Sequence, residues 1–150
     1  MTDAPSAGRF EGREHLLPVR VYYEDTDFSG VVYHGGYIRF FERGRSDFLR
    51  LAGVNHSDLL ADAQPTAFVV VRLEVDFRSP ARIDDALLVR TTYESVKGPR
   101  MLIRQRIERD GTLIAGAVVE AACVTLAGRP RKPPPGLLER LRPWFASVTP

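Results

Sequence analysis

The clearest pattern along the chain is an alternation of apolar and polar positions over residues 68–77. Its apolar positions are Val69, Val71, Leu73, Val75 and Phe77. A period of two puts every second side chain on the same face, so this segment predicts a half-buried β-strand. Residues 87–95 and 101–108 alternate less regularly and also predict strands, while residues 113–126 are apolar on both faces and predict a buried strand.

Short turns connect these predicted strands. Residues 84–85, 97–99 and 110–111 separate successive apolar stretches, and the Asp-Gly pair at 110–111 is among the strongest short-range hairpin signals. A weaker alternation over residues 17–23 predicts one more strand near the N-terminus.

Residues 36–51 follow a different period. Apolar side chains recur there at spacings of three, four and seven, at Tyr37, Phe40, Phe41, Phe48 and Leu51. This is the stripe of an amphipathic helix. A long helix followed by strands with short connections predicts an α+β fold, with an antiparallel sheet of about five strands around one helix. Because such a sheet leaves an exposed edge strand, we expect a homodimer with a continuous sheet.

The two ends differ from this central part. Residues 1–14 mix glycine, proline, serine and charge, and we expect a flexible N-terminal tail. Residues 129–135 read RPRKPPP and predict an extended stretch, after which residues 136–145 predict a short terminal helix. We therefore expect a single domain over residues 1–150, with its core at about 17–126.

Length and composition exclude several classes of protein. The 150 residues are enough for one domain, and a net charge of +2 is too small to indicate nucleic-acid binding. A single cysteine, Cys123, excludes an intramolecular disulfide and fits a reducing compartment. The first fifteen residues lack the apolar stretch of a secretion signal, and the longest apolar run is shorter than the ~20 residues that span a bilayer.

Several kinds of enzyme site are missing from the sequence. No GxSxG, GxxxxGK[ST] or GxGxxG motif occurs, and the histidines at positions 15, 34 and 56 lack the spacing of metal ligands. We therefore expect neither a metal nor a nucleotide cofactor.

Acidic side chains gather just before the predicted helix. Glu24, Asp25 and Asp27 fall within four positions, and strand alternation would place Asp25 and Asp27 on one face. Repulsion and partial burial are then expected to raise the pKa of one of them, as suits a general base or a nucleophile. The free N–H groups of the helix start would form an oxyanion site for a carbonyl oxygen. Acidic residues also stabilise helix starts in solvent, and the pattern alone leaves this alternative open.

Residues 21–54 carry a resemblance to a known family. The string VYYEDTDFSGVVYHGGYIRFFERGRSDFLRLAGV, above all its core D-x-x-G-V-V-Y-H-x-x-Y at residues 27–37, resembles the signature of hotdog-fold acyl-CoA thioesterases of the 4-hydroxybenzoyl-CoA thioesterase type. Within these it is most similar to the Tol-Pal-associated acyl-CoA thioesterase group. The resemblance extends over about residues 17–126.

The resemblance implies a set of catalytic residues. It places the essential carboxylate at Asp27 and the carbonyl-polarising N–H near Tyr33 and His34, whose side chains belong to the same motif. Phe28 follows the aspartate where relatives often carry smaller residues, so the length of the acyl chain stays open.

The resemblance also implies residues that bind substrate. These are Gly30, Val31 and Tyr37 in the motif itself. The hairpin that carries Lys97 and Arg100 lies in a region where relatives bind the nucleotide part of CoA, and both side chains offer cations to its phosphates. Both are also ordinary residues of a solvated turn, and this alternative stays open.

The implied activity is hydrolysis of a short-chain acyl-CoA to a carboxylate and free CoA in the cytoplasm, without a metal or an organic cofactor. The resemblance further implies a homodimer with the site at its interface, and dimers that pair into a homotetramer. It also implies that any association with the membrane is peripheral. Acyl carrier protein is a candidate partner. Two alternatives use the same scaffold: a non-catalytic module that binds acyl-CoA or acyl carrier protein, and a hydroxyacyl dehydratase in which His34 pairs with Glu42.

Overall fold

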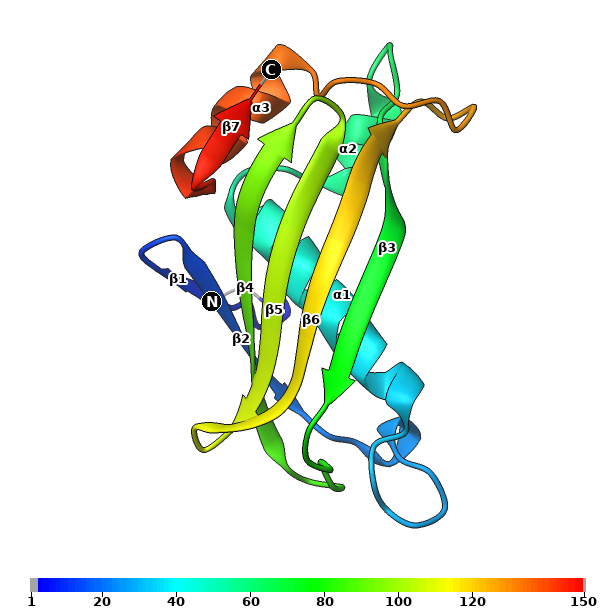
Figure 1. Ribbon diagram of the computed structural model, residues 1–150, viewed down its shortest axis with the longest axis vertical. Helices are drawn as coiled ribbons and strands as arrows, with labels where there is room; N and C mark the ends of the chain where they lie inside the picture. The colour runs from blue at the N-terminus through cyan, green and yellow to red at the C-terminus, as the bar shows by residue number, and fades with distance from the viewer. Residues whose placement is uncertain (1–2, 150) are drawn as a thin grey trace.

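The structure, a computed structural model, describes residues 3–149 and has a seven-stranded sheet at its centre (Figure 1). The strands lie in the order β1-β2-β4-β5-β6-β3, and β7 pairs with β4 beside this path. All neighbours are antiparallel except β4 and β7, which are parallel. The strands are β1 (Arg9–Glu11), β2 (Glu14–Arg20), β3 (Ala67–Phe77), β4 (Ala86–Lys97), β5 (Arg100–Arg109), β6 (Thr112–Val124) and β7 (Ser147–Thr149).

One long helix crosses one face of this sheet, and the face turned toward the viewer in Figure 1 carries no helix. The helices are α1 (His34–Leu51), α2 (His56–Ala61) and α3 (Pro135–Leu141), with the single 3₁₀ turns η1 (Tyr23–Asp25) and η2 (Arg142–Trp144). None of the helices among residues 3–149 is long and apolar enough to cross a membrane.

The expected α+β architecture is confirmed, and its boundaries lie within a few residues of those predicted. The Asp110-Gly111 turn joins β5 to β6 with positive φ angles of 50° and 80°, as a two-residue hairpin turn requires. The sheet is larger than the five strands expected, because the short strands β1 and β7 extend it.

The aromatic stripe of α1 forms the centre of the core. The rings of Tyr37, Phe40, Phe41 and Phe48 are all buried against the sheet. Burial of each such side chain stabilises the fold by about 1.5–3 kcal/mol. Leu51, the last member of the predicted stripe, is 40% exposed and lies at the end of the helix.

The expectation of a loose N-terminal tail is wrong for residues 8–14. The amide of Gly8 donates to Asp47 Oδ2 at 2.8 Å, and His15 Nε2 lies 2.7 Å from the same oxygen. Phe10 packs its ring against Phe48, with ring centroids 4.9 Å apart. The tail is therefore held to α1 by contacts between residues far apart in sequence. Residues 1 and 2 of the predicted tail, and Pro150, lie outside the described residues.

The C-terminal segment also adds to the core. Residues 131–134 form neither helix nor strand, and α3 and η2 follow as the expected short helix. Pro135, the last residue of the stretch predicted to be extended, is the first residue of α3. Leu137, Leu141 and Phe145 are buried, and Trp144 packs against Phe10. The core thus reaches beyond the predicted limits of 17 and 126, because both ends of the chain fold onto the side of the sheet formed by β2 and β4.

Candidate active site

The residues of the predicted motif form a tight turn that leads into α1. The backbone of Asp27 donates to the carbonyl of Val31 at 2.9 Å, and that of Gly30 donates to the carbonyl of Asp27 at 3.0 Å. Gly30 has a φ of +81°, a conformation that glycine adopts without strain. The turn is fixed to the loop after β3, because Val32 donates to the carbonyl of Ala81 at 2.9 Å.

The carboxylate of Asp27 is ionised and exposed in the single chain. Its Oδ1 accepts hydrogen bonds from the backbone N–H of Ser29 at 2.8 Å and from the Ser29 hydroxyl at 2.5 Å. These bonds hold the pKa of Asp27 below its usual value. The prediction that repulsion and burial raise the pKa is therefore wrong for Asp27.

Asp25 is buried in the turn before the motif and stabilises that turn. Residues 23–25 form the 3₁₀ turn η1 and not the end of a strand, so the predicted alternation does not hold. The side chain of Asp25 is buried and its Oδ2 accepts the backbone N–H of Tyr22 at 2.8 Å. This bond caps η1. Of the two aspartates expected to share a face, only Asp27 is exposed and available to a ligand.

The start of α1 offers free backbone donors. Tyr33 precedes the helix in an extended conformation and makes no side-chain cap. The N–H of Gly36 donates to the carbonyl of Tyr33 at 2.9 Å, whereas those of His34 and Gly35 have no acceptor among the described residues. Such donors, at the positive end of the helix dipole, stabilise a developing oxyanion.

Two consecutive glycines allow the turn to lie against this helix start. A Cβ on Gly36 would lie 2.7 Å from Val32 Cγ1, and one on Gly35 would lie 2.6 Å from the Tyr33 ring. A side chain at Gly36 would therefore push the turn away from the helix, and one at Gly35 would displace the Tyr33 ring.

A hollow of about 360 Å³, open to solvent, lies beside the helix start. Its walls are Val32, His34, Tyr37, Phe77, Arg78, Ser79 and Pro80. The hydroxyl of Tyr37 accepts the backbone N–H of Ala81 at 2.9 Å, so this side chain fixes the loop that forms the far wall. No local pattern in the sequence predicts this wall, because it comes from the end of β3, forty residues after the motif.

The other predicted residues of the motif lie in the turn and at the start of α1. Gly30 and Val31 belong to the turn and contact the loop after β3, through the bond from Ile83 N–H to the Gly30 carbonyl and the bridge between Val31 and Arg82. Tyr33 stacks edge-on against His34, with ring centroids 5.8 Å apart.

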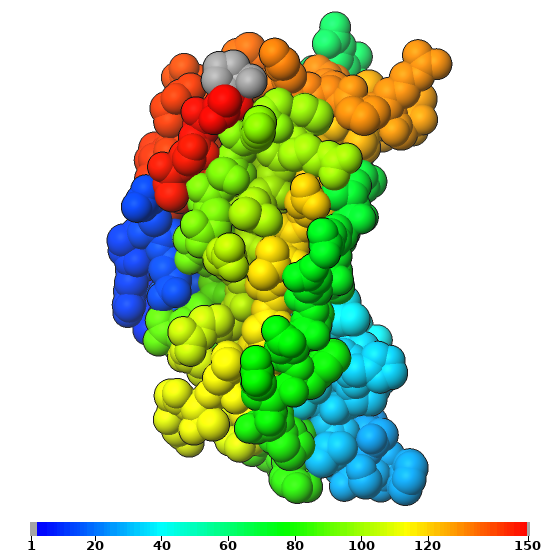
Figure 2. Space-filling model, viewed as in Figure 1, coloured from blue at the N-terminus to red at the C-terminus, as the bar shows by residue number. Residues whose placement is uncertain are grey.

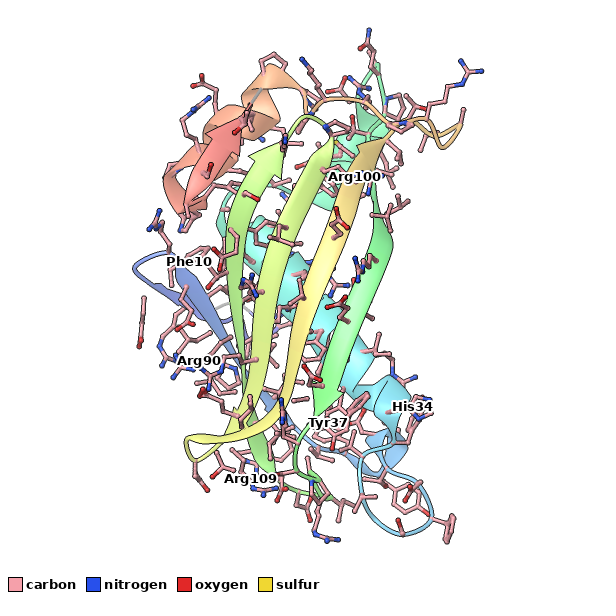
Figure 3. The ribbon with its side chains drawn as sticks, viewed as in Figure 1. Phe10, His34, Tyr37, Arg90, Arg100 and Arg109 are labelled. Carbon is pink, nitrogen blue, oxygen red and sulfur yellow. The ribbon has the colours of Figure 1, made fainter. Side chains whose placement is uncertain are left out.

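Lys97 and Arg100 lie at the opposite end of the same sheet. Figure 3 shows Arg100 near one end of the molecule and His34 and Tyr37 near the other. A single chain therefore does not bring the predicted phosphate-binding cations to the predicted catalytic residues. The carboxylate of Asp27 likewise lies outside the lining of the hollow.

A metal centre and a reactive thiol would be two further kinds of site among the described residues. Within residues 3–149, no three His, Cys, Asp or Glu side chains are grouped to hold a metal ion. Cys123 is buried, and burial raises the pKa of its thiol to about 11, so it is protonated at neutral pH.

Comparison with known proteins gives consistent results. The sequence model of the thioesterase-like superfamily matches residues 21–145. The chain is 47% identical over 110 residues to "Acyl-CoA thioesterase YbgC" of Haemophilus influenzae, covering 73% of this chain and 80% of that protein. It is 40% identical over 127 residues to "Acyl-CoA thioester hydrolase YbgC" of Escherichia coli, covering 83% of this chain and 93% of that protein. The crystal structure of a probable thioesterase from Bartonella henselae superposes with a TM-score of 0.78 at 41% identity, covering 81% of this chain and 99% of that one.

Proposed function

Because this chain belongs to the thioesterase-like superfamily and has its hotdog fold, we propose that it hydrolyses acyl-CoA thioesters to a carboxylate and free CoA at the start of α1. The observation that carries the site assignment is the position of Asp27, in a turn pinned directly before a helix whose first N–H groups are free. The names of the relatives support the reaction, and the geometry supports the residues.

Hydrolysis of a thioester needs hydrogen-bond donors for the carbonyl oxygen and a base or nucleophile for the carbonyl carbon. The N–H groups of His34 and Gly35 receive the thioester oxygen and stabilise its developing charge, an effect worth a few kcal/mol per donor. The ionised Asp27 either attacks the carbonyl carbon or removes a proton from an attacking water. In the first route CoA leaves as the thiolate and water then cleaves the mixed anhydride. In the second, hydroxide adds directly and the thiolate leaves from the tetrahedral intermediate.

The site is completed by a second copy of the chain. β3 pairs with β6 on one side, and its other edge is unpaired among the described residues. Val69, Val70 and Val71 are each between 42% and 49% exposed along this strand, and Figure 2 shows it along one long side of the molecule. An apolar, unpaired edge favours antiparallel pairing with the same strand of a partner, which gives a homodimer with a continuous sheet.

This pairing brings together the start of α1 and the β4–β5 hairpin, which lie at opposite ends of the sheet in one chain. Tyr37 contacts Phe77 at the end of β3, with ring centroids 5.6 Å apart, whereas Arg100 is level with Val69 near its beginning, through Ala122. A two-fold axis through an antiparallel β3 pair places the beginning of one strand beside the end of the other. Lys97 and Arg100 of one copy thus come to the helix start of the other, where they meet the phosphates of CoA.

Further properties implied by the family stay predictions. They are the short acyl chain, the pairing of dimers into a homotetramer, the Tol-Pal association, acyl carrier protein as a partner and the cytoplasmic location. The dehydratase alternative is disfavoured within one chain, because Glu42 lies eight residues after His34 on α1, about 12 Å along the helix, and its carboxylate accepts the Ser46 hydroxyl at 2.9 Å.

A substrate panel tests this function. Purified protein is incubated with acetyl-, butyryl-, octanoyl-, benzoyl- and 3-hydroxybutyryl-CoA, and free thiol and enoyl product are measured in the same samples. We expect thiol release without enoyl product. A chain that binds these thioesters without releasing thiol is a binding module, and enoyl product without thiol identifies a dehydratase; either result refutes the proposal.

A further inference from the structure

The hollow beside the start of α1 combines an apolar surface with one cationic side chain. Its apolar members are Val32, Tyr37, Phe77 and Pro80, and its polar members are His34, Arg78 and Ser79. No acid belongs to this lining, and the carboxylate of Asp27 lies outside it. A plain alkyl acyl group would contact only the apolar part and would make no use of the cation.

Arg78 differs from the other arginines at this end of the molecule. Arg109, which Figure 3 shows at the same end as Tyr37, donates to Asp85 Oδ2 at 2.7 Å. Arg82 lies near the same carboxylate and helps to lower its pKa, and Arg20 donates to a backbone carbonyl of the same loop at 2.8 Å. These three cations are therefore directed at the loop that follows β3, and none of them lines the hollow.

The backbone of Arg78 is fixed at the rim of the hollow, and its side chain is left for a ligand. The N–H groups of Arg78 and Ser79 both donate to the carbonyl of Ile114, at 2.8 and 3.1 Å. Within residues 3–149, the guanidinium of Arg78 forms neither a hydrogen bond nor an ion pair, although it belongs to the lining. The hydroxyl of Ser79, half-buried in the same wall, is a further hydrogen-bond donor.

The charges around the hollow favour an anion at the wall that Arg78 forms. The free N–H groups of α1 are occupied by the thioester oxygen in the proposed reaction. The ionised Asp27, on the turn, repels any second negative group of a substrate that lies near it. Arg78 follows the last residue of β3 and belongs to the opposite wall, where a positive charge compensates such a group.

We propose that Arg78 selects acyl-CoA thioesters whose acyl group ends in a second carboxylate, with the methylene chain on the apolar surface and the carboxylate on the guanidinium. The planar guanidinium donates two parallel N–H bonds to a carboxylate, a geometry that no other side chain offers. A volume of about 360 Å³ lies within the range of ~300–1,000 Å³ that is typical of small-molecule sites. The inference rests on the proposed function, because it names the class of acyl group that the same site accepts.

Two substrates of equal shape test this selectivity. In 5-methylhexanoyl-CoA, two methyl groups replace the two carboxylate oxygens of glutaryl-CoA, so the pair differs in charge and hardly in size. The ratio kcat/KM is measured for both with wild type, Arg78→Ala and Arg78→Lys, after subtraction of spontaneous thiol release. We expect Arg78→Ala to lower kcat/KM about tenfold for glutaryl-CoA, the effect of one lost charge-assisted hydrogen-bond pair, and by less than about twofold for 5-methylhexanoyl-CoA. Arg78→Lys keeps the charge and should recover most of the loss.

A matched variant separates the wall of the hollow from the general charge of this end. Arg20→Ala removes the same charge from the same end of the molecule outside the lining, and we expect both values of kcat/KM to stay within about twofold of wild type. An equal fall for both substrates in Arg78→Ala would mean that the side chain meets the CoA part of the substrate, and it overturns the proposal. The absence of any fall for glutaryl-CoA overturns it as well.

Thioether analogues make the test independent of hydrolysis. The 4-carboxybutyl and 5-methylhexyl thioethers of CoA have the two shapes described above but no thioester carbonyl, and calorimetry measures their Kd. We expect Arg78→Ala to weaken binding of the carboxybutyl thioether about tenfold and to leave the Kd of the methylhexyl thioether unchanged. This result supports the role of Arg78 even if no thioester is hydrolysed, in which case the proposed function alone fails. An equal Kd of wild type and Arg78→Ala for the carboxybutyl thioether overturns the inference.

Discussion

Gly36 controls the distance between the Asp27 turn and the start of α1, so its replacement by alanine tests the site geometry. A Cβ at this position would lie 2.7 Å from Val32 Cγ1, whereas ordinary contacts begin at 3.4 Å. Val32 must therefore move by about 0.7 Å. Its side chain is buried and its backbone is bonded to Ala81, so the strain passes to the adjacent turn.

The expected effect of Gly36→Ala is large on activity and small on stability. A misplacement near 1 Å in a catalytic group costs about a hundredfold in rate, so we expect kcat to fall by between tenfold and a hundredfold. Crowding lowers the free energy of unfolding by about 1–3 kcal/mol, and the better helix propensity of alanine offsets about 1 kcal/mol of this loss. Stopped-flow thiol release and urea unfolding measure the two quantities.

A matched glycine in another helix provides the control. Gly136 lies in α3, and a Cβ there meets no atom within 4 Å. Gly136→Ala should leave kcat unchanged and the free energy of unfolding equal or slightly higher. Wild-type kcat in a folded Gly36→Ala protein would refute the reasoning, because it would mean that the turn need not lie close to the helix.

Three more predictions follow from other contacts. Burial lowers the pKa of His15, so the unfolded chain takes up a proton first as the pH falls below about 6.5. The free energy of unfolding should therefore decrease as the pH is lowered, by up to about 1.4 kcal/mol per pH unit, and should decrease less in His15→Gln. Tyr37→Phe leaves the buried N–H of Ala81 without its acceptor and should cost about 1–3 kcal/mol in urea unfolding; an unchanged midpoint contradicts this bond. Val70→Glu should convert the dimer to monomer in sedimentation and abolish activity, whereas Leu126→Glu, at a more exposed position off the β3 edge, should change neither.

Local patterns in the sequence determine the parts of the fold that were predicted well. The alternation over residues 68–77 and the Asp-Gly pair at 110–111 act through near neighbours, and the structure has the predicted strand and the predicted hairpin turn. The predicted half-buried face of the strand is wrong, because the register shifts between Val70 and Arg72 and Val69, Val71 and Phe77 are exposed along this edge strand. The stripe of α1 is equally local, because residues three and four apart share a face. The expected helix begins two residues late, since His34 and Gly35 carry no apolar signal.

Contacts between distant residues account for the parts that were not predicted. Gly8 is fixed by Asp47, thirty-nine residues later, and Phe10 by Trp144, so composition alone indicated a loose tail. The low pKa of Asp27 comes from Ser29, whose orientation depends on the turn. The wall of the hollow and the position of Arg100 depend on the register of the sheet, which no short segment contains.

The most direct test of the account is the turnover of Asp27→Asn on an acyl-CoA. Asparagine keeps the size and the hydrogen-bonding shape of the side chain but can neither attack the thioester as a carboxylate nor take a proton from water. We expect kcat to fall about a thousandfold with unchanged unfolding, and Asp58→Asn on α2 to leave both unchanged. Turnover of Asp27→Asn within a few-fold of wild type would contradict the claim that this carboxylate performs the hydrolysis.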